Sequence, residues 1–236
     1  MDELALREEI IATAIAMNAR GLNRGKSGNV SARIDAGFLV TPTGLAYDSM
    51  RPEDIVAMTH DGAARGSRLP SSEWRFHRDI YAARLEVTAI VHAHSPFATT
   101  LACLGRDIPA FHYMIAVAGG SDIRCAPYAT FGTQELSDHA LRALDNRKAC
   151  LLANHGMIAV GTTLTEALAL AVEVEALAEQ YWRALQIGKP AVLSDSEMEI
   201  VLEKFKTYGK NTNEQRATRR TRRKSKNKTA IGSRNP

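Results

Sequence analysis

The chain has 236 residues, 45% of them hydrophobic, which is typical of one globular domain with a core of its own. No run approaches the roughly 20 consecutive apolar residues that a membrane-spanning helix needs. The N-terminal segment MDELALREEI carries acids where a signal peptide has basic and then apolar residues. We therefore expect a cytoplasmic protein that does not bind membranes.

The formal net charge of +4 is concentrated at one end of the chain. Residues 210–236 contain ten Lys and Arg and a single acid, Glu214, which leaves 20 basic and 25 acidic residues for 1–209. This basic segment has no apolar stripe and is predicted to be disordered. Such segments are most often solvated extensions, although a polyanion such as nucleic acid could bind here with release of counterions. We therefore predict a folded domain over 1–209 and a disordered tail over 210–236.

The first part of the chain is predicted to begin with a helix and to continue into short strands. Apolar residues recur at helical spacing over 3–20, and Gly21 closes this helix. The segment 25–31 is rich in Gly, Ser and Asn and predicts a loop. Three runs rich in β-forming residues follow, at 38–41, 55–59 and 87–92.

The second part alternates helices with two further strands. Pro70-Ser71-Ser72-Glu73 predicts a helix start, with a serine as N-cap and Glu73 in the first turn of a helix that ends near 83. Two capping boxes, Thr163–Glu166 and Ser194–Glu197, open the last two helices, which are predicted to end at 187 and at 209. The remaining elements are helices at 96–104 and 134–144 and strands at 149–153 and 157–160. The pattern favours a layered α/β domain over a helical bundle or a β-sandwich.

Two histidines stand at the end of an apolar strand, in Val87-Thr-Ala-Ile-Val-His92-Ala-His94. Side chains alternate along a strand, so residues two apart share a face about 7 Å from each other and can converge on one metal ion. An isolated His-x-His pair is as often formed by two core histidines. The pair alone therefore leaves both interpretations open.

A third histidine, His155, favours the metal. It lies between two apolar runs in LLANHGMIAV, where a polar side chain needs a hydrogen-bonding partner or a ligand. Three imidazoles without cysteine are typical of a catalytic zinc ion with an open fourth position. We therefore predict one zinc ion per chain, with His92, His94 and His155 as ligands. His60, His77 and His139 are interpreted as surface or packing residues, with the alternative for His77, one turn beyond Glu73, that it supports a residue of the site without binding the metal itself.

Glu73 and three small polar segments complete the candidate site. A carboxylate at a helix start can be held by backbone N–H groups and can accept a proton beside a metal, although an ordinary helix-start acid has the same sequence pattern. The segments could hold an anion through unpaired N–H groups: Ser27-Gly28-Asn29, Thr43-Gly44 and Ser71-Ser72. The chain has neither a Gly-x-Gly-x-x-Gly motif nor a Walker lysine, so no nucleotide-binding motif is indicated.

Taken together, these motifs resemble the class II aldolase/adducin family. The similar stretches run in order over about residues 2–209 and include PSSEWRFH, IVHAHS, HYMIA, APYATFGT and KFKTYG. Within the family, the resemblance is greatest to the members that cleave L-fuculose 1-phosphate. It implies a single layered catalytic domain over 1–209, with a central, mainly antiparallel β-sheet flanked by helices. It also implies a homotetramer with active sites between subunits.

The resemblance assigns a role to each candidate residue. His92, His94 and His155 would hold zinc, and Glu73 would exchange between metal ligand and acid–base catalyst. Tyr113 would protonate or polarise the aldehyde oxygen. The other residues would bind the phosphorylated sugar. Its phosphate would be bound by Gly28, Asn29, Thr43, Gly44, Ser71 and Ser72. Its aldehyde half would be positioned by Phe131, Phe205 and Tyr208.

The implied reaction is the reversible cleavage of a ketose 1-phosphate to dihydroxyacetone phosphate and a small aldehyde of the lactaldehyde type. A paralogue that cleaves 5-deoxyribulose 1-phosphate would look much the same. HYMIA and KFKTYG disfavour an oxo-tetronate-phosphate decarboxylase or a methylthioribulose-phosphate dehydratase without excluding either. A pentulose-phosphate 4-epimerase would be expected to carry Asp in place of Glu73. Adducin-like binding domains would be expected to lack the three histidines, and a polyanion-binding protein would depend on the tail.

Overall fold

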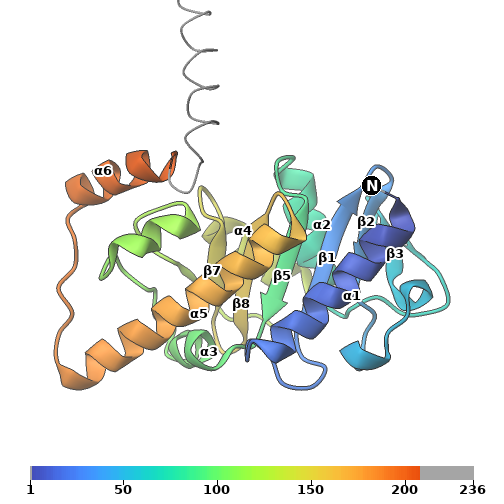
Figure 1. Ribbon diagram of the computed structural model, residues 1–236, viewed down its shortest axis with the longest axis horizontal. Helices are drawn as coiled ribbons and strands as arrows, with labels where there is room; N and C mark the ends of the chain where they lie inside the picture. Colours follow the sequence, from blue (N-terminus) through green and yellow to red (C-terminus); the bar gives the residue numbers. More distant parts are fainter. Residues whose placement is uncertain (1, 208–236) are drawn as a thin grey trace, which may run out of the picture.

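The computed structural model describes residues 2–207, and its centre is an eight-stranded sheet in the order β4-β3-β2-β1-β5-β8-β7-β6 (Figure 1). Neighbouring strands are antiparallel except for the parallel pair β6–β7. The strands are β1 (Asn29–Ile34), β2 (Gly37–Val40), β3 (Val56–Thr59), β4 (Ala64–Arg65), β5 (Ala89–Ala93), β6 (Cys125–Ala126), β7 (Ala149–Leu152) and β8 (Gly156–Gly161). The predicted α/β domain with a mainly antiparallel sheet is confirmed.

Helices cover both faces of this sheet (Figure 1). On one face α1 packs on β1, and α5 packs on β5 and β8 with α3 beside it. On the other face α2 and α4 pack against each other and against β2, β6 and β7. The helices are α1 (Glu3–Ala19), α2 (Trp74–Ala83), α3 (Pro96–Cys103), α4 (Gln134–Ala143), α5 (Leu164–Ile187) and α6 (Asp195–Phe205), with 3₁₀ helices η1 (Tyr47–Ser49), η2 (Pro52–Asp54) and η3 (Tyr113–Ala118).

Alternation along the central strand β5 divides the core into two layers. Val91 and its neighbours at 89 and 93 belong to the hydrophobic cluster that includes residues of α1, α3 and α5. Ile90 belongs to the cluster on the α2 and α4 side, together with Phe76 and Ile80 of α2. His92 is two residues beyond Ile90 and packs its ring edge-on against Phe76, so the strand period directs it to the α2 side.

The predicted helix starts at α5 and α6 are confirmed. The Thr163 hydroxyl accepts a hydrogen bond from the N–H of Glu166 at 3.1 Å, and the Ser194 hydroxyl accepts one from Glu197 at 3.2 Å. These bonds satisfy backbone donors that a helix start otherwise leaves unpaired. None of the helices within 2–207 is long and apolar enough to cross a bilayer.

Three local predictions were wrong. The polar segment 25–31 was expected to be a loop, but from Asn29 onward it is strand β1, because its backbone pairs with β5 opposite His92. Glu73 is the N-cap of α2 rather than a first-turn residue, and no serine side chain caps this helix. The last helix ends at Phe205 rather than at 209. The predicted tail lies outside the described residues.

Candidate metal centre

The end of β5 brings His92 and His94 together. Both residues are on the α2 side of the sheet, as their spacing in a strand predicts. Their ring centroids are 4.8 Å apart, and their Nε2 atoms are 3.0 Å apart. The N–H of His94 donates to the side-chain oxygen of Asn23 at 2.7 Å, which holds the chain where it leaves the strand.

His155 reaches the same point from the connection between β7 and β8. Asn154 adopts a left-handed conformation there, with φ of 55°. A Cβ atom on Gly156 would lie 2.4 Å from the carbonyl oxygen of Ala93, so a glycine is needed for this hairpin to pack against the end of β5. As a result, the His155 ring centroid lies 4.9 Å from those of His92 and His94.

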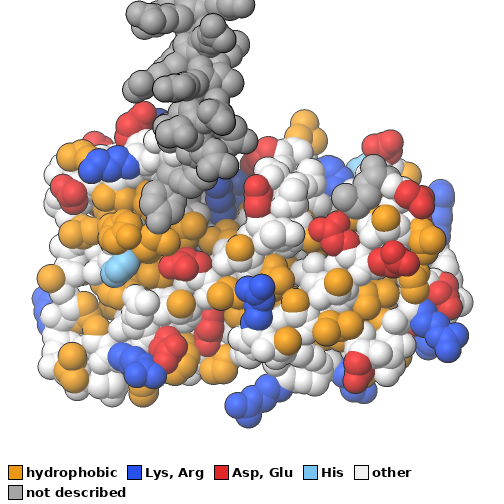
Figure 2. All heavy atoms as spheres, viewed as in Figure 1, with side chains coloured by type: hydrophobic (Ala, Val, Ile, Leu, Met, Phe, Trp, Pro, Cys, Tyr) orange, Lys and Arg blue, Asp and Glu red, His pale blue; other side chains and the backbone are white. Residues whose placement is uncertain are grey.

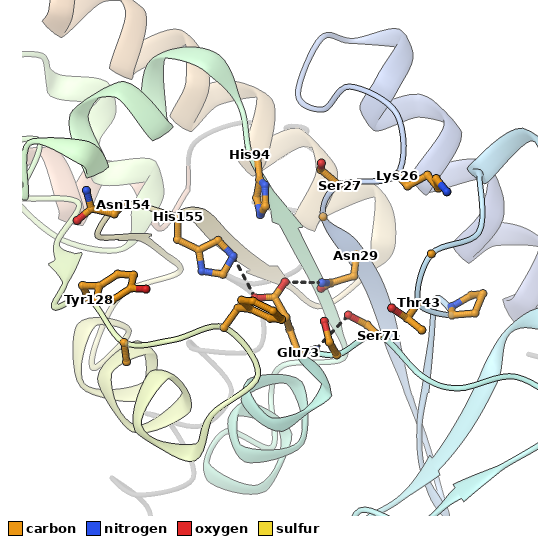
Figure 3. Close-up of a pocket in the computed structure, with 16 residues that line it drawn as sticks. Lys26, Ser27, Asn29, Thr43, Ser71, Glu73, His94, Tyr128, Asn154 and His155 are labelled. Atoms are coloured by element: carbon orange, nitrogen blue, oxygen red, sulfur yellow. Dashed lines mark hydrogen bonds and ion pairs between the residues drawn. The ribbon is translucent and has the colours of Figure 1, made fainter.

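Glu73 enters from the start of α2. The chain before it is tied to the end of β2, because the N–H of Ser71 donates to the carbonyl oxygen of Thr41 at 3.0 Å. The carboxylate is nearly buried, and its oxygens lie 3.1 Å from Nε2 of His92 and 3.0 Å from Nε2 of His155. Figure 3 shows His94 and His155 facing Glu73 across one end of a pocket.

The orientation of these atoms fits a bound cation. Nδ1 of His92 lies 2.9 Å from the carbonyl oxygen of Met157, which can only accept, so Nδ1 carries the proton and Nε2 presents a lone pair. In the neutral ring this lone pair faces a carboxylate oxygen of Glu73 at 3.1 Å, and two acceptors so close need a metal ion or a proton between them; Nε2 of His94 lies 3.0 Å away on another side. The other Glu73 oxygen is buried and lies 3.0 Å from Nε2 of His155, without a hydrogen bond of normal geometry among the described residues.

A single metal ion would satisfy the whole cluster. One ligand atom from each of Glu73, His92, His94 and His155 lies within 4.8 Å of all the others. Three imidazoles and a carboxylate are a ligand set that binds zinc and other divalent first-row metals. The hydrogen bond from His92 to a backbone carbonyl is the contact that usually orients a metal-binding imidazole.

The electrostatics give Glu73 and His94 the protonation states that metal ligands need. Burial by itself would raise the pKa of Glu73, but charge and hydrogen bonds at His92 and His155 hold that pKa far below its usual range. Burial, together with charge on the neighbouring rings, lowers the pKa of His94 to about 3. The carboxylate is therefore ionised and the His94 ring is neutral near pH 7, as metal binding requires. At His92, by contrast, burial is outweighed by the neighbouring Glu73 carboxylate, which raises the pKa of that ring, so a metal ion would displace a proton there.

The rest of the pocket, which has a volume of about 340 Å³, is lined by small polar residues. The three polar segments of the sequence meet here, although each comes from a different part of the fold. Figure 3 shows Ser27 and Thr43 beyond Asn29, on the side away from His155. All six predicted phosphate-binding residues and Phe131 line this pocket: Gly28, Asn29, Thr43, Gly44, Ser71 and Ser72.

Gly28 is held in the pocket wall by close packing. Its φ is +78°, and a Cβ atom would lie 2.4 Å from the Asn23 amide nitrogen and 2.5 Å from the backbone oxygen of His92. We expect Gly28→Ala to lower the free energy of unfolding by about 2 kcal/mol or more and to raise KM for a phosphorylated substrate. Gly25→Ala is the matched control, because Gly25 has a φ of +70° but nothing within 4 Å of a Cβ atom.

Denaturant unfolding of the two variants measures this difference. Gly25→Ala should lower the free energy of unfolding by only about 1 kcal/mol, which is the cost of alanine in a left-handed conformation. Equal losses in the two variants would contradict the role of close packing at Gly28.

The pocket also contains residues that were not predicted to form it. Tyr128 and Asn154 line the wall near His155, and Lys26 stands at the opposite end (Figure 3). Within the described part of the chain, Lys26 is the only Lys or Arg that lines this pocket. Tyr128 lies inside the APYATFGT stretch, which was the one sequence signal that could have identified it.

Two predicted site residues, one catalytic and one substrate-binding, lie elsewhere in the single chain. Tyr113 and Phe205, with ring centroids 6.5 Å apart, line a separate pocket of about 540 Å³ between η3 and α6. Hydrophobic side chains gather at the surface over this part of the molecule, on the left of Figure 2. Tyr208 lies outside the described residues.

Comparisons with known proteins agree on one family. The family model for the class II aldolase and adducin N-terminal domain matches residues 8–182. The chain is 62% identical over 208 residues to the 5-methylthioribulose-1-phosphate/5-deoxyribulose-1-phosphate aldolase of Rhodospirillum rubrum, covering 88% of this chain and 94% of that protein. It is 51% identical over 210 residues to the L-fuculose phosphate aldolase of Escherichia coli K12, covering 89% of this chain and 98% of that protein. A solved L-fuculose 1-phosphate aldolase matches with a TM-score of 0.82 at 43% identity, over 85% of this chain and 95% of that chain.

Proposed function

The chain belongs to the class II aldolase and adducin family, and we propose that it is a zinc-dependent aldolase that cleaves a ketose 1-phosphate reversibly to dihydroxyacetone phosphate and a small aldehyde. The observation that carries this proposal is the convergence of three imidazoles and one carboxylate at one end of a pocket whose other end is lined by small polar residues. An adducin-like role confined to protein binding would not require this ligand set.

Different residues of the chain would bind the substrate, hold the metal ion and transfer the proton. The small polar residues would hold the phosphate and so place the sugar carbons near the histidines. A divalent ion held by the cluster would supply Lewis-acid stabilisation of the negative charge that develops when the bond between carbons 3 and 4 breaks. In cleavage the 4-hydroxyl would lose its proton as carbon 4 leaves as the aldehyde, the ionised Glu73 carboxylate would take up a proton, and Glu73 would then deliver a proton to carbon 3; synthesis would reverse these transfers.

Lys26 supports the assignment of the far end of the pocket to phosphate. It has no ion-pair partner among the described residues and lines the same pocket as Thr43, beyond Ser27 in Figure 3. We expect Lys26→Met to raise KM for the ketose 1-phosphate about three- to five-fold without changing kcat, as for an exposed ion pair. The effect should shrink at high salt, because exposed charges are screened.

Steady-state kinetics at low and high ionic strength check this prediction. Lys189→Met is the control, because Lys189 is exposed and does not line the pocket. A fall in kcat with no change in KM for Lys26→Met would contradict a role in phosphate binding.

The aldehyde half of the substrate is the second part of the proposal. The relative that acts on 5-methylthioribulose and 5-deoxyribulose 1-phosphates shares 62% of its aligned residues with this chain, and the L-fuculose phosphate aldolase shares 51%. We therefore propose a 5-deoxypentulose 1-phosphate as the preferred substrate, with L-fuculose 1-phosphate as the alternative. Cleavage of 5-deoxyribulose 1-phosphate would release acetaldehyde, and cleavage of L-fuculose 1-phosphate would release lactaldehyde.

Product analysis with a panel of ketose 1-phosphates and 5-phosphates tests both parts. The proposal expects dihydroxyacetone phosphate from 1-phosphates only, fastest from the 5-deoxypentulose, and no product in the presence of a chelator. Epimerised or decarboxylated products without dihydroxyacetone phosphate would instead identify one of the other family activities.

We also propose that the chain acts as a cytoplasmic homotetramer. Tyr113 and Phe205 are remote from the metal cluster in one chain, and they would complete the site of a neighbouring subunit. The exposed hydrophobic side chains near η3 and α6 support an interface there (Figure 2). Light scattering of the purified protein would test the tetramer, and a monomeric, fully active protein would contradict it.

A further inference from the structure

Four buried polar side chains form a row behind Glu73. Asn29 and Ser31 are two residues apart on β1, and His77 and Tyr81 are four residues apart on α2, so each pair shares a face of its element. The two faces oppose each other, and none of the four residues is more than 2% exposed. Phe76 and Phe38 pack beside the His77 ring, with ring centroids at 4.5 and 6.5 Å.

A continuous series of hydrogen bonds connects the four side chains of this row to Glu73. The Asn29 amide nitrogen donates to a Glu73 carboxylate oxygen at 3.1 Å. The Asn29 amide oxygen lies 2.5 Å from Nε2 of His77, and Nδ1 of His77 lies 2.7 Å from the Ser31 hydroxyl. The Ser31 hydroxyl in turn lies 2.7 Å from the Tyr81 hydroxyl.

The acceptor at the Glu73 end determines which atom donates in each hydrogen bond of this row. The ionised Glu73 carboxylate can only accept, so the Asn29 amide must turn its nitrogen to Glu73 and its oxygen to His77. Nε2 of His77 must then carry a proton, and in the neutral ring Nδ1 accepts from the Ser31 hydroxyl. The Ser31 oxygen is left to accept from Tyr81.

We propose that His77 is a positioning residue that acts on Glu73 through Asn29: its Nε2–H locks the Asn29 amide so that an N–H always faces the catalytic carboxylate. Without this lock the amide could rotate by half a turn and direct its oxygen at the carboxylate, which would displace Glu73 from its orientation for proton transfer. Burial lowers the pKa of His77 to about 3, so the ring remains neutral and keeps both hydrogen bonds. The catalytic part of this proposal rests on the proposed function, but the tautomer does not.

The tautomer can be tested without any substrate. A long-range ¹H–¹⁵N NMR spectrum of the wild-type protein distinguishes protonated from unprotonated ring nitrogens. We expect His77 to remain in the neutral Nε2–H form from pH 5.5 to pH 8. A proton on Nδ1, or a positively charged ring in this range, would overturn the proposal even if the aldolase assignment holds.

Two variants of His77 test its action on catalysis. His77→Leu removes the donor to Asn29, whereas the amide of His77→Gln can present an N–H from about the position of Nε2. We expect His77→Leu to lower kcat about tenfold with little change in KM and with zinc retained, and His77→Gln to recover to within about threefold of wild type.

Ser137→Ala controls for a general loss of stability. Ser137 is fully buried in α4 and donates to Asp79 of α2 at 2.6 Å, away from Glu73, so its loss should lower the melting temperature without lowering kcat. Equal loss of kcat in both His77 variants, or full kcat in folded His77→Leu, would overturn the positioning role. A wild-type protein that cleaves no ketose 1-phosphate would refute the proposed function instead, and the NMR result would still decide the tautomer.

Discussion

Glu73→Gln should lower the rate of aldol cleavage at least about 1,000-fold while the protein still binds zinc. The substitution is nearly isosteric but removes the group that accepts and returns the proton at carbon 3. The three histidines keep their mutual distances of 4.8 to 4.9 Å between ring centroids, so the metal retains three of its ligands. Proton transfer and metal binding are thereby separated in one variant.

The measurement is kcat together with zinc content by mass spectrometry. Glu166→Gln is the matched control, because Glu166 is also an acid at a helix start, where it accepts from the N–H of Thr162 at 3.0 Å. If Glu73 were only a helix-start acid, the two variants would behave alike. A Glu73→Gln enzyme with near wild-type rates would remove this residue from the mechanism.

His155→Ala should abolish both zinc binding and cleavage. The remaining two imidazoles and the carboxylate hold the ion less tightly, and we expect a loss of affinity of at least about 100-fold, because even changes to outer-shell partners cost 10- to 100-fold. His155 lies in the connection between β7 and β8 rather than in a strand, so its loss should leave the sheet intact. Dialysed protein should contain almost no zinc.

His60→Ala is the control for the loss of a histidine, because His60 is exposed and is not part of the metal cluster. It should retain full zinc content and activity. A His155→Ala variant that is free of metal yet cleaves substrate at the wild-type rate would contradict the metal-dependent mechanism. In the same way, loss of zinc from His60→Ala would show that the protein loses metal for reasons other than its ligands.

The site could be predicted from sequence wherever it depends on local periodicity. The strand period alone places His92 and His94 on one face, and the structure brings them together there. The position of His155 depends on long-range contacts, namely the pairing of β5 with β8 and the close approach that Gly156 permits. The apolar run around His155 indicated only that the residue needed a partner, and the identity of that partner required the fold.

Other features could not be found by periodicity. Asn29 lies in a segment whose composition is that of a loop, yet pairing with β5 makes it a strand residue beside His92, because sheet pairing overrides a weak local preference. His77 was interpreted as a packing residue or as a residue that supports the site, and its contact with Asn29 appears only when β1 and α2 face each other. The roles of Tyr113 and Phe205 came from family resemblance alone, and one chain does not bring them to the metal cluster.

The most direct test of this account is a zinc titration of protein that has first been freed of metal with a chelator. Formation of dihydroxyacetone phosphate from a ketose 1-phosphate should be absent at the start, rise in proportion to added zinc and stop rising at one ion per chain. The same titration of His155→Ala should give no activity at these concentrations. Full cleavage by the wild-type protein before any zinc is added, with metal absent by mass spectrometry, would contradict the central claim that the histidine and glutamate cluster acts through a bound metal ion.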